Sequence, residues 1–374
     1  MTHLKNENQN TYRWVILLVF GLMLESCFLL LGFYIWMNQS EMSLSAIWNP
    51  ADSIIMISPE PVWQETSANE QIPTVAVLTT ITNGVGETIT PATVFPPQSS
   101  APSIPVIPDP PGGKIVYTCF DGSYDQICIM NADGKEQRQL TNYVGTSFYP
   151  SLSPNGNAIV FSSRVDGNFE IYMMDINGEN VIKLTDDIGN LFAPEISPKE
   201  NRIVFTRESG GLQAIWVMKL DGRNPHPLFE SNGFDIDPTW SPNAMQVAFA
   251  SKGESGTSLF VIDSTGKKVQ QVSPNGLNIG GRSSWSPDGE WLSFYAGEKG
   301  SRNLYSVSVS SQELIQRTNE GDNLAPSYST DGKWLAFTSF RDGNNEIYIQ
   351  SLIGLGVYRL TYQPNADWQP RWGP

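Results

Sequence analysis

The feature that most constrains the fold of this chain is a repeat of about 44 residues, which runs from Lys114 to the end of the sequence. Each copy opens with a short run of mostly apolar residues, and successive runs start 43 to 45 positions apart. The six runs are IVYT (115–118), IVFS (159–162), IVFT (203–206), VAFA (247–250), LSFY (292–295) and LAFT (335–338). Two further sets follow in register, beginning with Ile127-Cys128 and Leu140-Thr141 in the first copy. Three registers with one period indicate six copies of one structural unit.

Turn residues divide each copy into short strands. Asp166-Gly167 and Asp342-Gly343 separate the first run from the second, and Asp133-Gly134 separates the second from the third. Such pairs supply the positive φ angles that tight hairpins need. No stretch of the repeats has the length and the 3.6-residue period of a core helix. A period of 43–45 residues with about four strands therefore predicts the blades of a β-propeller.

A fourth strand is predicted just before the first run of each unit. It starts at Pro150, Pro194, Pro238, Ser283 and Pro326, and a sixth copy starts at Pro370. The first repeat has no such strand, so the C-terminal strand is expected to complete it and close the ring, which removes free sheet edges. The predicted blades are 114–149 with 370–374, 150–193, 194–237, 238–282, 283–325 and 326–369. The predicted fold class is all-β, with a six-bladed β-propeller over residues 113–374.

Two motifs within the units resemble the TolB-type, WD-related propeller repeat. They are S-P-D-G-x-W-L-x-F at 286–294 and F-x-S-x-x-D-G-x-x-E-I-Y at 161–172, and the second recurs at 337–348. The Asp-Gly pair after Ser-Pro is kept at Asp288-Gly289 but is replaced at Asn155-Gly156, Lys199-Glu200 and Asn243-Ala244. The resemblance covers the whole repeat region. It implies a propeller that binds a protein or peptide in the cell envelope without catalysing a reaction.

The segment 14–36 is predicted to cross a membrane. It has 23 residues with one ionisable side chain, Glu25, and at about 1.5 Å per residue it is long enough to span a hydrocarbon core of about 30 Å. Lys5 and Arg13 precede it, and no Lys or Arg follows before Lys114, so the positive-inside rule places residues 1–13 in the cytoplasm. We predict an uncleaved signal-anchor helix over 14–37 in the cell membrane, with Glu25 as a candidate contact for a membrane partner. A cleaved signal peptide is the less favoured alternative.

Residues 38–112 have the composition of a stalk. They contain no Lys or Arg, seven acidic residues, and many Pro, Thr and Ser residues. Such a segment buries too little apolar surface to order itself, and its prolines favour an extended chain. We therefore expect a disordered acidic stalk that holds the propeller outside the membrane.

Composition argues against several classes of function. The net charge of −15 leaves no basic face for a nucleic acid. The only histidines are His3 and His226, so a multi-histidine metal site is impossible and a serine triad has at most one base available. No G-x-S-x-G motif occurs. Asp235 and Asp237 form the one carboxylate pair considered for glycosidase chemistry, and nothing else in the sequence supports it. A hydrolase or lyase is therefore disfavoured.

Two hairpins and two cysteines remain as candidate sites. Oxygen-bearing residues cluster at Asp166, Asn168 and Glu170 and again at Asp342, Asn344 and Glu346, which would suit Ca²⁺, although hairpin turns use these residue types for backbone reasons. We predict no metal and no cofactor. Cys119 and Cys128 align with positions on neighbouring strands of the second repeat, so a disulfide and two buried thiols are equal alternatives.

A partner is expected at the mouth of the central channel, where loops enter the innermost strands. The residues predicted to face it are Tyr149, Asp235, Asp237, Arg282, Asn323, Asp367 and Gln369. The favoured function is non-enzymatic binding of an envelope protein or peptide. The alternative is a carbohydrate-binding propeller, which exposed aromatic rings at Phe148, Tyr149, Phe192 and Trp368 would favour.

Overall fold

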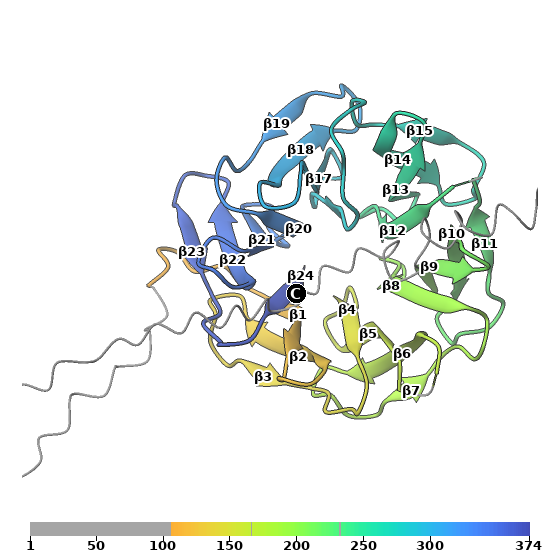
Figure 1. Ribbon diagram of the computed structural model, residues 1–374, viewed down its shortest axis with the longest axis horizontal. Helices are drawn as coiled ribbons and strands as arrows, with labels where there is room; N and C mark the ends of the chain where they lie inside the picture. The colour runs from red at the N-terminus through yellow and green to blue at the C-terminus, as the bar shows by residue number, and fades with distance from the viewer. Residues whose placement is uncertain (1–105, 166, 232) are drawn as a thin grey trace, which may run out of the picture. The chain divides into compact units, whose positions relative to one another are not determined.

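The computed structural model describes residues 106–165, 167–231 and 233–374, which form six four-stranded antiparallel sheets around one axis (Figure 1). The six-bladed propeller predicted from the repeat is confirmed. Among the described residues, none forms a helix long and apolar enough to cross a membrane.

Each sheet uses its strands in the same order from the axis outward. The innermost strands are β24 (Asp367–Gly373), β4 (Ser147–Leu152), β8 (Asn190–Ile196), β12 (Asp235–Trp240), β16 (Ser284–Trp285) and β20 (Asn323–Tyr328). The second strands are β1 (Lys114–Phe120), β5 (Ala158–Ser163), β9 (Arg202–Ser209), β13 (Gln246–Gly253), β17 (Trp291–Ala296) and β21 (Trp334–Ser339). The third strands are β2 (Asp125–Asn131), β6 (Glu170–Asp175), β10 (Leu212–Lys219), β14 (Gly256–Asp263), β18 (Asn303–Ser308) and β22 (Glu346–Ser351). The outermost strands are β3 (Arg138–Gln139), β7 (Ile182–Lys183), β11 (His226–Phe229), β15 (Val269–Gln271), β19 (Leu314–Gln316) and β23 (Val357–Arg359).

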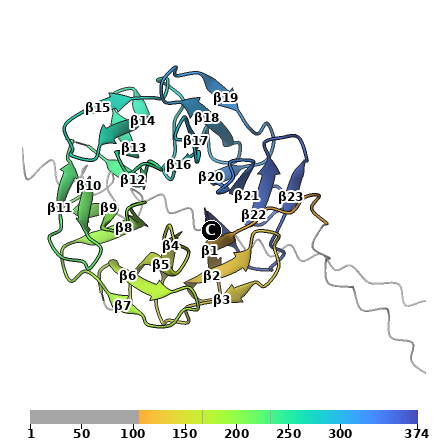
Figure 2. The ribbon, with the colours of Figure 1, turned by 180° about the vertical axis from the view of Figure 1, so that it is seen from behind.

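The first and last strands of the propeller share one sheet. β24 pairs antiparallel with β1, with Lys114 opposite Gly373 and Cys119 opposite Asp367, so the C-terminal strand completes the first blade as predicted. Both views show the C-terminus on the inside of the ring, next to β1 (Figures 1 and 2). The closing strand begins at Asp367, earlier than the predicted start at Pro370. The reason is that pairing continues on both sides of the bulge that precedes the proline.

Aromatic pairs across the second and third strands build the blades. In four blades a buried Phe of the second strand stacks on an aromatic residue directly opposite, with ring centroids 5.8–5.9 Å apart. The pairs are Phe161–Tyr172, Phe249–Phe260, Phe294–Tyr305 and Phe337–Tyr348. A pair of this kind contributes about 0.5–1.5 kcal/mol beyond the area it buries. The first two sets of the sequence repeat are therefore the two halves of one packing contact.

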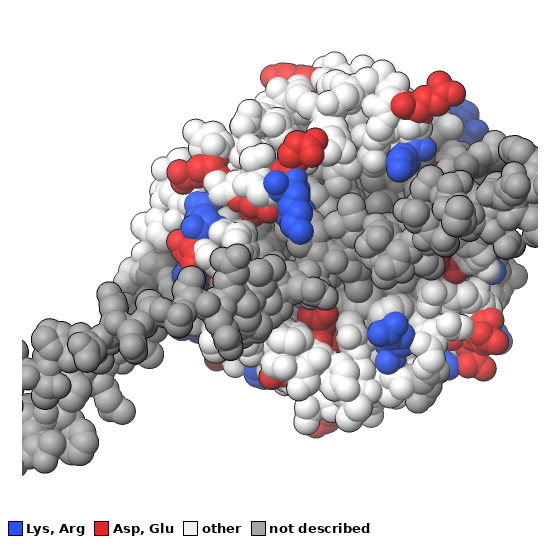
Figure 3. Space-filling view, in the orientation of Figure 1, with Lys and Arg blue, Asp and Glu red and all other residues white. Residues whose placement is uncertain are grey.

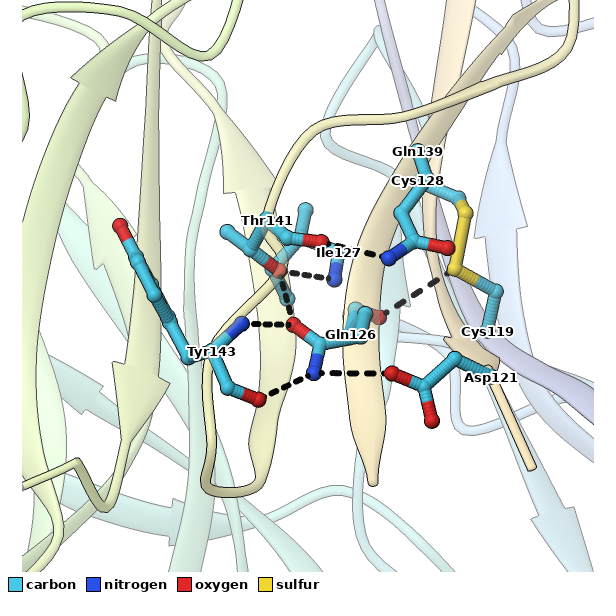
Figure 4. Close-up of a disulfide and its surroundings, with 8 residues drawn as sticks. All are labelled: Cys119, Asp121, Gln126, Ile127, Cys128, Gln139, Thr141 and Tyr143. Carbon is cyan, nitrogen blue, oxygen red and sulfur yellow. Dashed lines mark hydrogen bonds between the residues drawn. A yellow bond between two sulfur atoms is a disulfide. The ribbon is translucent and has the colours of Figure 1, made fainter. Parts of the chain in front are cut away.

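In five of the six blades, a hydroxyl of the third repeated set ties the outer part of the blade to the third strand. In the first blade Thr141 Oγ1 accepts the Ile127 N–H at 2.8 Å and donates to Gln126 Oε1 at 2.8 Å (Figure 4). In four other blades a hydroxyl accepts the equivalent backbone N–H at 2.9–3.0 Å. These hydroxyls belong to Thr185, Ser273, Thr318 and Thr361. This bond explains why a Thr or Ser recurs at this position.

The ordered part of the chain begins before the predicted boundary at residue 113. Ile107 is 6% exposed and packs in one apolar cluster with Trp334 and Trp372. The Trp372 indole N–H donates to the Gly112 carbonyl at 3.0 Å. Residues 107–112 therefore cover the junction between the first and last blades instead of belonging to a stalk. The predicted tail 1–13, the membrane helix 14–37 and stalk residues 38–105 lie outside the described residues.

Cys119 on β1 and Cys128 on β2 form a disulfide, with their Cα atoms 5.9 Å apart (Figure 4). Their partners in the ladder are Gln126 and Tyr117, so the bond joins the two strands diagonally. Both cysteines are buried in the cluster between the first and last blades. Of the two alternatives left open by the sequence, the structure has the disulfide.

The disulfide is expected to stabilise the propeller through the short loop that it closes. Its sequence separation is 9 residues, and replacing both cysteines by Ser should lower the free energy of unfolding by about 2–3 kcal/mol. Urea unfolding with and without dithiothreitol measures this. Wild type should lose the same amount in reductant, whereas the double variant should not respond; an equal response of both would contradict the prediction.

Candidate functional site

One residue within or just before each innermost strand has a left-handed backbone conformation. The six are Tyr149 (φ 55°), Ala193 (50°), Asp237 (54°), Arg282 (54°), Ala325 (48°) and Gln369 (54°). In five of the six strands the ladder shifts register here, as at a β-bulge, where two residues oppose one. The equal angles for unlike side chains mean that the fold, and not one strained residue, imposes this conformation. Four of the residues predicted to face a partner, Tyr149, Asp237, Arg282 and Gln369, belong to this set, which we call the bulge ring.

The bulge ring is held by hydrogen bonds from one blade to the next. The N–H of Asp237 donates to Thr206 Oγ1, and the N–H of Gln369 donates to Thr338 Oγ1, both at 2.9 Å. Each Thr lies at the fourth position of its repeat run, in the preceding blade. The N–H of Tyr149 donates instead to the side-chain carbonyl of Gln369 at 3.1 Å. The side chains around the axis are therefore fixed by contacts between blades.

The bond from Thr338 gives a direct test of this arrangement. Thr338→Val keeps the shape of the side chain but leaves the buried Gln369 N–H without an acceptor, which should cost about 1–3 kcal/mol of unfolding free energy. Thr257→Val on β14, where no side-chain bond is formed, should change it by less than about 0.5 kcal/mol. Urea unfolding of the two variants compares them, and equal losses would show that the bond does not matter.

Two arginines from different blades cross the axis. Arg282 Nη2 donates to the Pro150 carbonyl at 2.8 Å, and its guanidinium carbon lies 5.1 Å from the centre of the Tyr149 ring. Arg371, on β24, donates from Nη1 to the Ser283 carbonyl at 2.9 Å, and its Nη2 lies 3.5 Å from Glu195 Oε2. The centre of the ring is therefore occupied by a mixed-charge cluster contributed by four blades. Sequence reasoning found Arg282 but missed Arg371 and Glu195, although both stand two places after a bulge residue.

Burial and charge shape the ionisation of this cluster. Burial, together with the nearby charge of Arg371, lowers the pKa of Arg282 to about 9, while Asp237 acts in the opposite direction. Burial raises the pKa of Asp237, against the effect of both arginines and of the Arg282 N–H that its carboxylate accepts. Burial also raises the pKa of Tyr295 to about 12. At neutral pH Arg282 therefore remains charged, although it is buried.

The pair Gly280-Gly281 lets the fifth blade approach the cluster. A Cβ atom on Gly281 would overlap the Asp237 carboxylate, and one on Gly280 would overlap the ring of Tyr295. Any larger residue at either place would require one of these side chains to move. β16 begins at Ser284, and before the bulge an isolated bridge between Ile279 and Ala296 continues the ladder.

Of the seven residues predicted to face a partner at the channel mouth, only Tyr149 is partly exposed, and the other six are buried. Asp235 accepts bonds from the Ser231 N–H and Oγ at 2.9 and 3.0 Å, and Asn323 donates to the Glu320 carbonyl at 2.8 Å. Asp367 lies near Glu346, and burial followed by the charge of Glu346 raises its pKa well above the ordinary range. Their role in binding a partner stays a prediction, and in the folded chain Asp235 and Asn323 already hold the loops that lead into the inner strands.

The end of the propeller where the innermost strands begin, which we call the entry face, carries the exposed aromatic rings. The three exposed aromatic residues among those described are Phe120 and Tyr124, at the β1–β2 hairpin, and Phe340, at the β21–β22 hairpin. Phe340 is 42% exposed. The N–H of Phe120 donates to the Ala366 carbonyl at 2.9 Å, just before β24, which places this hairpin beside the start of an inner strand. We call these three residues the aromatic group; sequence reasoning did not find it, because hairpin residues gave no repeat signal.

The aromatic residues considered for sugar binding are placed differently. Phe148, Phe192 and Trp368 are buried, and Tyr149 is partly covered and lies under Arg282. Phe148 packs edge-on against Phe169, with ring centres 4.8 Å apart. These rings therefore belong to the packing between blades.

Charged side chains of both signs are interspersed on the face of the propeller seen in Figure 3, so this face has no patch of a single charge sign.

Asp125, at the start of β2, lies beside the aromatic group. Burial raises its pKa from 3.8 to about 6, against the hydrogen bond from Trp368, and the neighbouring charge of Asp121 adds to the rise. A carboxyl group with a raised pKa in the folded state favours folding while it is protonated. That contribution is complete below about pH 4 and is lost as the pH rises through about 6.

Asp125→Asn removes this titration. It should raise the unfolding free energy by about 1–3 kcal/mol at a pH of about 7.5 and change it little at a pH of about 4. Urea unfolding at both pH values tests this, with the exposed Asp186→Asn as the matched control. The same gain at both pH values would contradict the assignment.

The two hairpins considered for Ca²⁺ have their oxygens in use. Thr185 Oγ1 donates to Glu170 at 2.5 Å, and Thr361 Oγ1 donates to Glu346 at 2.5 Å. Arg359 forms ion pairs with both Glu346, at 2.7 Å, and Asp342, at 3.1 Å, and so places a guanidinium where a cation would lie. Asp166 lies outside the described residues. Within the described ranges, no group of three or more His, Cys, Asp or Glu side chains is arranged to hold a metal ion.

A family model described as TolB beta propeller domain matches residues 92–220 and 214–374. The chain belongs to the TolB β-propeller family. No curated protein matches it in sequence.

Solved structures share the fold of this TolB-family propeller at low sequence identity. TolB from Acinetobacter baumannii is 20% identical, with a TM-score of 0.65 over 72% of this chain and 68% of that chain. A protein assigned as TolB in Agrobacterium tumefaciens is 14% identical, with a TM-score of 0.56 over 70% of this chain and 98% of that one. A puromycin hydrolase is 15% identical, with a TM-score of 0.50 over 69% of this chain and 45% of its own length. At these identities the likeness concerns the fold.

The TolB-family turn after the innermost strand survives the replacement of its Asp-Gly pair. Ser286 Oγ donates to Asp288, and the same bond is made by Ser153 to Asn155 at 2.8 Å and by Ser241 to Asn243 at 2.9 Å. Glu200 (φ 52°) and Ala244 (φ 59°) take the left-handed position of the glycine, which costs about 1–2 kcal/mol for a residue with a side chain. The substitutions thus keep the turn at a modest energetic cost.

Proposed function

We propose that this TolB-family chain is a non-enzymatic binding protein that recognises a protein or peptide through the entry face of its propeller. The observation that carries the proposal is the aromatic group, since its rings are the exposed aromatic side chains of the described residues and come from two neighbouring blades. Aromatic residues are enriched at protein interfaces and dominate their binding energy. The expectation from the family resemblance points the same way.

We further propose that residues 14–37 anchor the chain in the cell membrane, with residues 1–13 in the cytoplasm and the propeller outside. The charge asymmetry around the apolar segment supports this orientation. The Cys119–Cys128 disulfide supports an oxidising compartment for the propeller. A partner in the envelope fits both observations.

The placement of His226 argues against a hydrolase of the serine type. His226, the one histidine in the described ranges, lies exposed on the outermost strand β11, and its Nδ1 contacts the carbonyl of Asn224 at 2.9 Å. A triad base would have to lie against a nucleophile and a positioning acid. The carbohydrate alternative has less support than a protein partner, because the rings considered for sugar stacking are buried.

The proposal is tested by photo-crosslinking with the full-length chain in mild detergent. p-Benzoylphenylalanine is placed at Tyr124 or Phe340, or at Ile353 as a control; Ile353 is exposed in the β22–β23 turn, at the opposite end of the blade. Protein adducts are expected from the first two positions and not from Ile353. Adducts equally frequent at Ile353, or a glycan array signal without any protein adduct, would overturn the proposal.

Once the partner is identified, Phe340→Ala should weaken its affinity at least about tenfold, as expected for an aromatic residue at the centre of an interface. Ile353→Ala should leave the affinity within about twofold. Surface plasmon resonance with full-length variants measures both dissociation constants. An unchanged affinity for Phe340→Ala would move the interface away from the entry face.

A further inference from the structure

Arg282 is a buried cation without a counterion at contact distance. It is 4% exposed, and among the described residues no carboxylate oxygen lies within the 4.0 Å of an ion pair. Its guanidinium donates to two carbonyls, of Pro150 at 2.8 Å and of Gln369 at 3.5 Å, while its Nε has no hydrogen-bond partner. A buried charge that lacks a counterion and a buried donor that lacks an acceptor are both costly.

Ser283, the next residue in the chain, adds a second unpartnered group. Its hydroxyl is buried and forms no hydrogen bond within the described part of the chain. The other five blades have proline at this place, which has no hydroxyl and no N–H to donate. These prolines are Pro150, Pro194, Pro238, Pro326 and Pro370. The fifth blade is thus the one that offers donors at this position of the ring.

The two nearest carboxylates already have other partners. Asp237 accepts the backbone N–H of Arg282, not its guanidinium. Glu195 accepts the Trp240 N–H at 2.7 Å and the Thr239 hydroxyl at 3.0 Å, and it pairs with Arg371. Neither carboxylate neutralises Arg282 directly. Its guanidinium therefore lacks both a counterion and an acceptor for Nε in the folded cluster.

We propose that Arg282 and Ser283 bind one carboxylate group at the centre of the propeller, supplied by a peptide as an acidic side chain or a C-terminus. The planar guanidinium matches a carboxylate in shape, and the hydroxyl donates to its second oxygen. The site takes a single negative charge, because Glu195 and Asp237 repel a second one. The peptide as source rests on the proposed function, whereas the carboxylate site itself does not.

The experiment uses the full-length chain in mild detergent and measures thermal stability at constant ionic strength. The probes are sodium acetate against sodium chloride, and N-acetyl-Ala-Ala-Ala as the free acid against its C-terminal amide. Acetate and the tripeptide acid should raise the melting temperature, and chloride and the amide should not. The affinity from these titrations should fall at least about tenfold in Arg282→Gln. Arg223→Gln, at an exposed arginine, is the control and should bind as wild type does.

Each other result is decisive. Equal stabilisation of wild type and Arg282→Gln, or none by either carboxylate, overturns the site. If Arg282→Gln does not fold, Ser283→Ala replaces it, and an affinity for acetate equal to that of wild type overturns the site. Binding of acetate without the tripeptide acid overturns the peptide as source. A protein partner at the entry face that binds Arg282→Gln and wild type equally overturns this proposal alone, whereas carboxylate binding without any protein partner overturns the proposed function alone.

Discussion

The pairing of β24 with β1 is the interaction on which the propeller depends. Every other blade is continuous in sequence, and its sheet packs against the sheets of its two neighbours, as in other repeat architectures. Side chains near the axis, Arg282 and Arg371, also reach blades that are not neighbours. The first sheet alone joins the two ends of the repeat region. The same strand carries Gln369 and Arg371 to the axis and Trp372 into the cluster that covers the last junction. The strand that closes the ring therefore also supplies residues of its centre.

The centre differs from the rest of the structure in what holds it together. Between blades the contacts are apolar and aromatic, and they tolerate small changes as long as volume is kept. Around the axis the contacts are hydrogen bonds and charges with little water, where one missing partner is expensive. Arg282 shows this difference, since it satisfies part of its guanidinium with carbonyl groups and the face of Tyr149 and leaves Nε unpaired.

Much of the fold could be predicted from the sequence, because the constant spacing between similar runs shows where the strands of each blade begin. The period located the second strand of each blade, and the leftover copy at Pro370 revealed the closing strand. The bulge ring was also located, through its place before the prolines. Asp235 and Asn323 were misplaced to the surface, because the sequence does not show that short polar side chains at strand starts bond to their own loops. Arg371 and Glu195 were missed for a related reason: only the packed ring determines which long side chains meet across the axis.

The bulge ring separates backbone from side chain in a way that bears on how such proteins diversify. Tyr, Ala, Asp, Arg and Gln occupy the six positions with nearly the same φ, and the bonds that fix the backbone come from the neighbouring blade. The backbone of the ring is thus compatible with side chains of very different size and charge. A duplicated propeller gene could therefore acquire a new specificity by changing these side chains, provided that the bonds made by Gln369 and Arg282 to other blades are replaced.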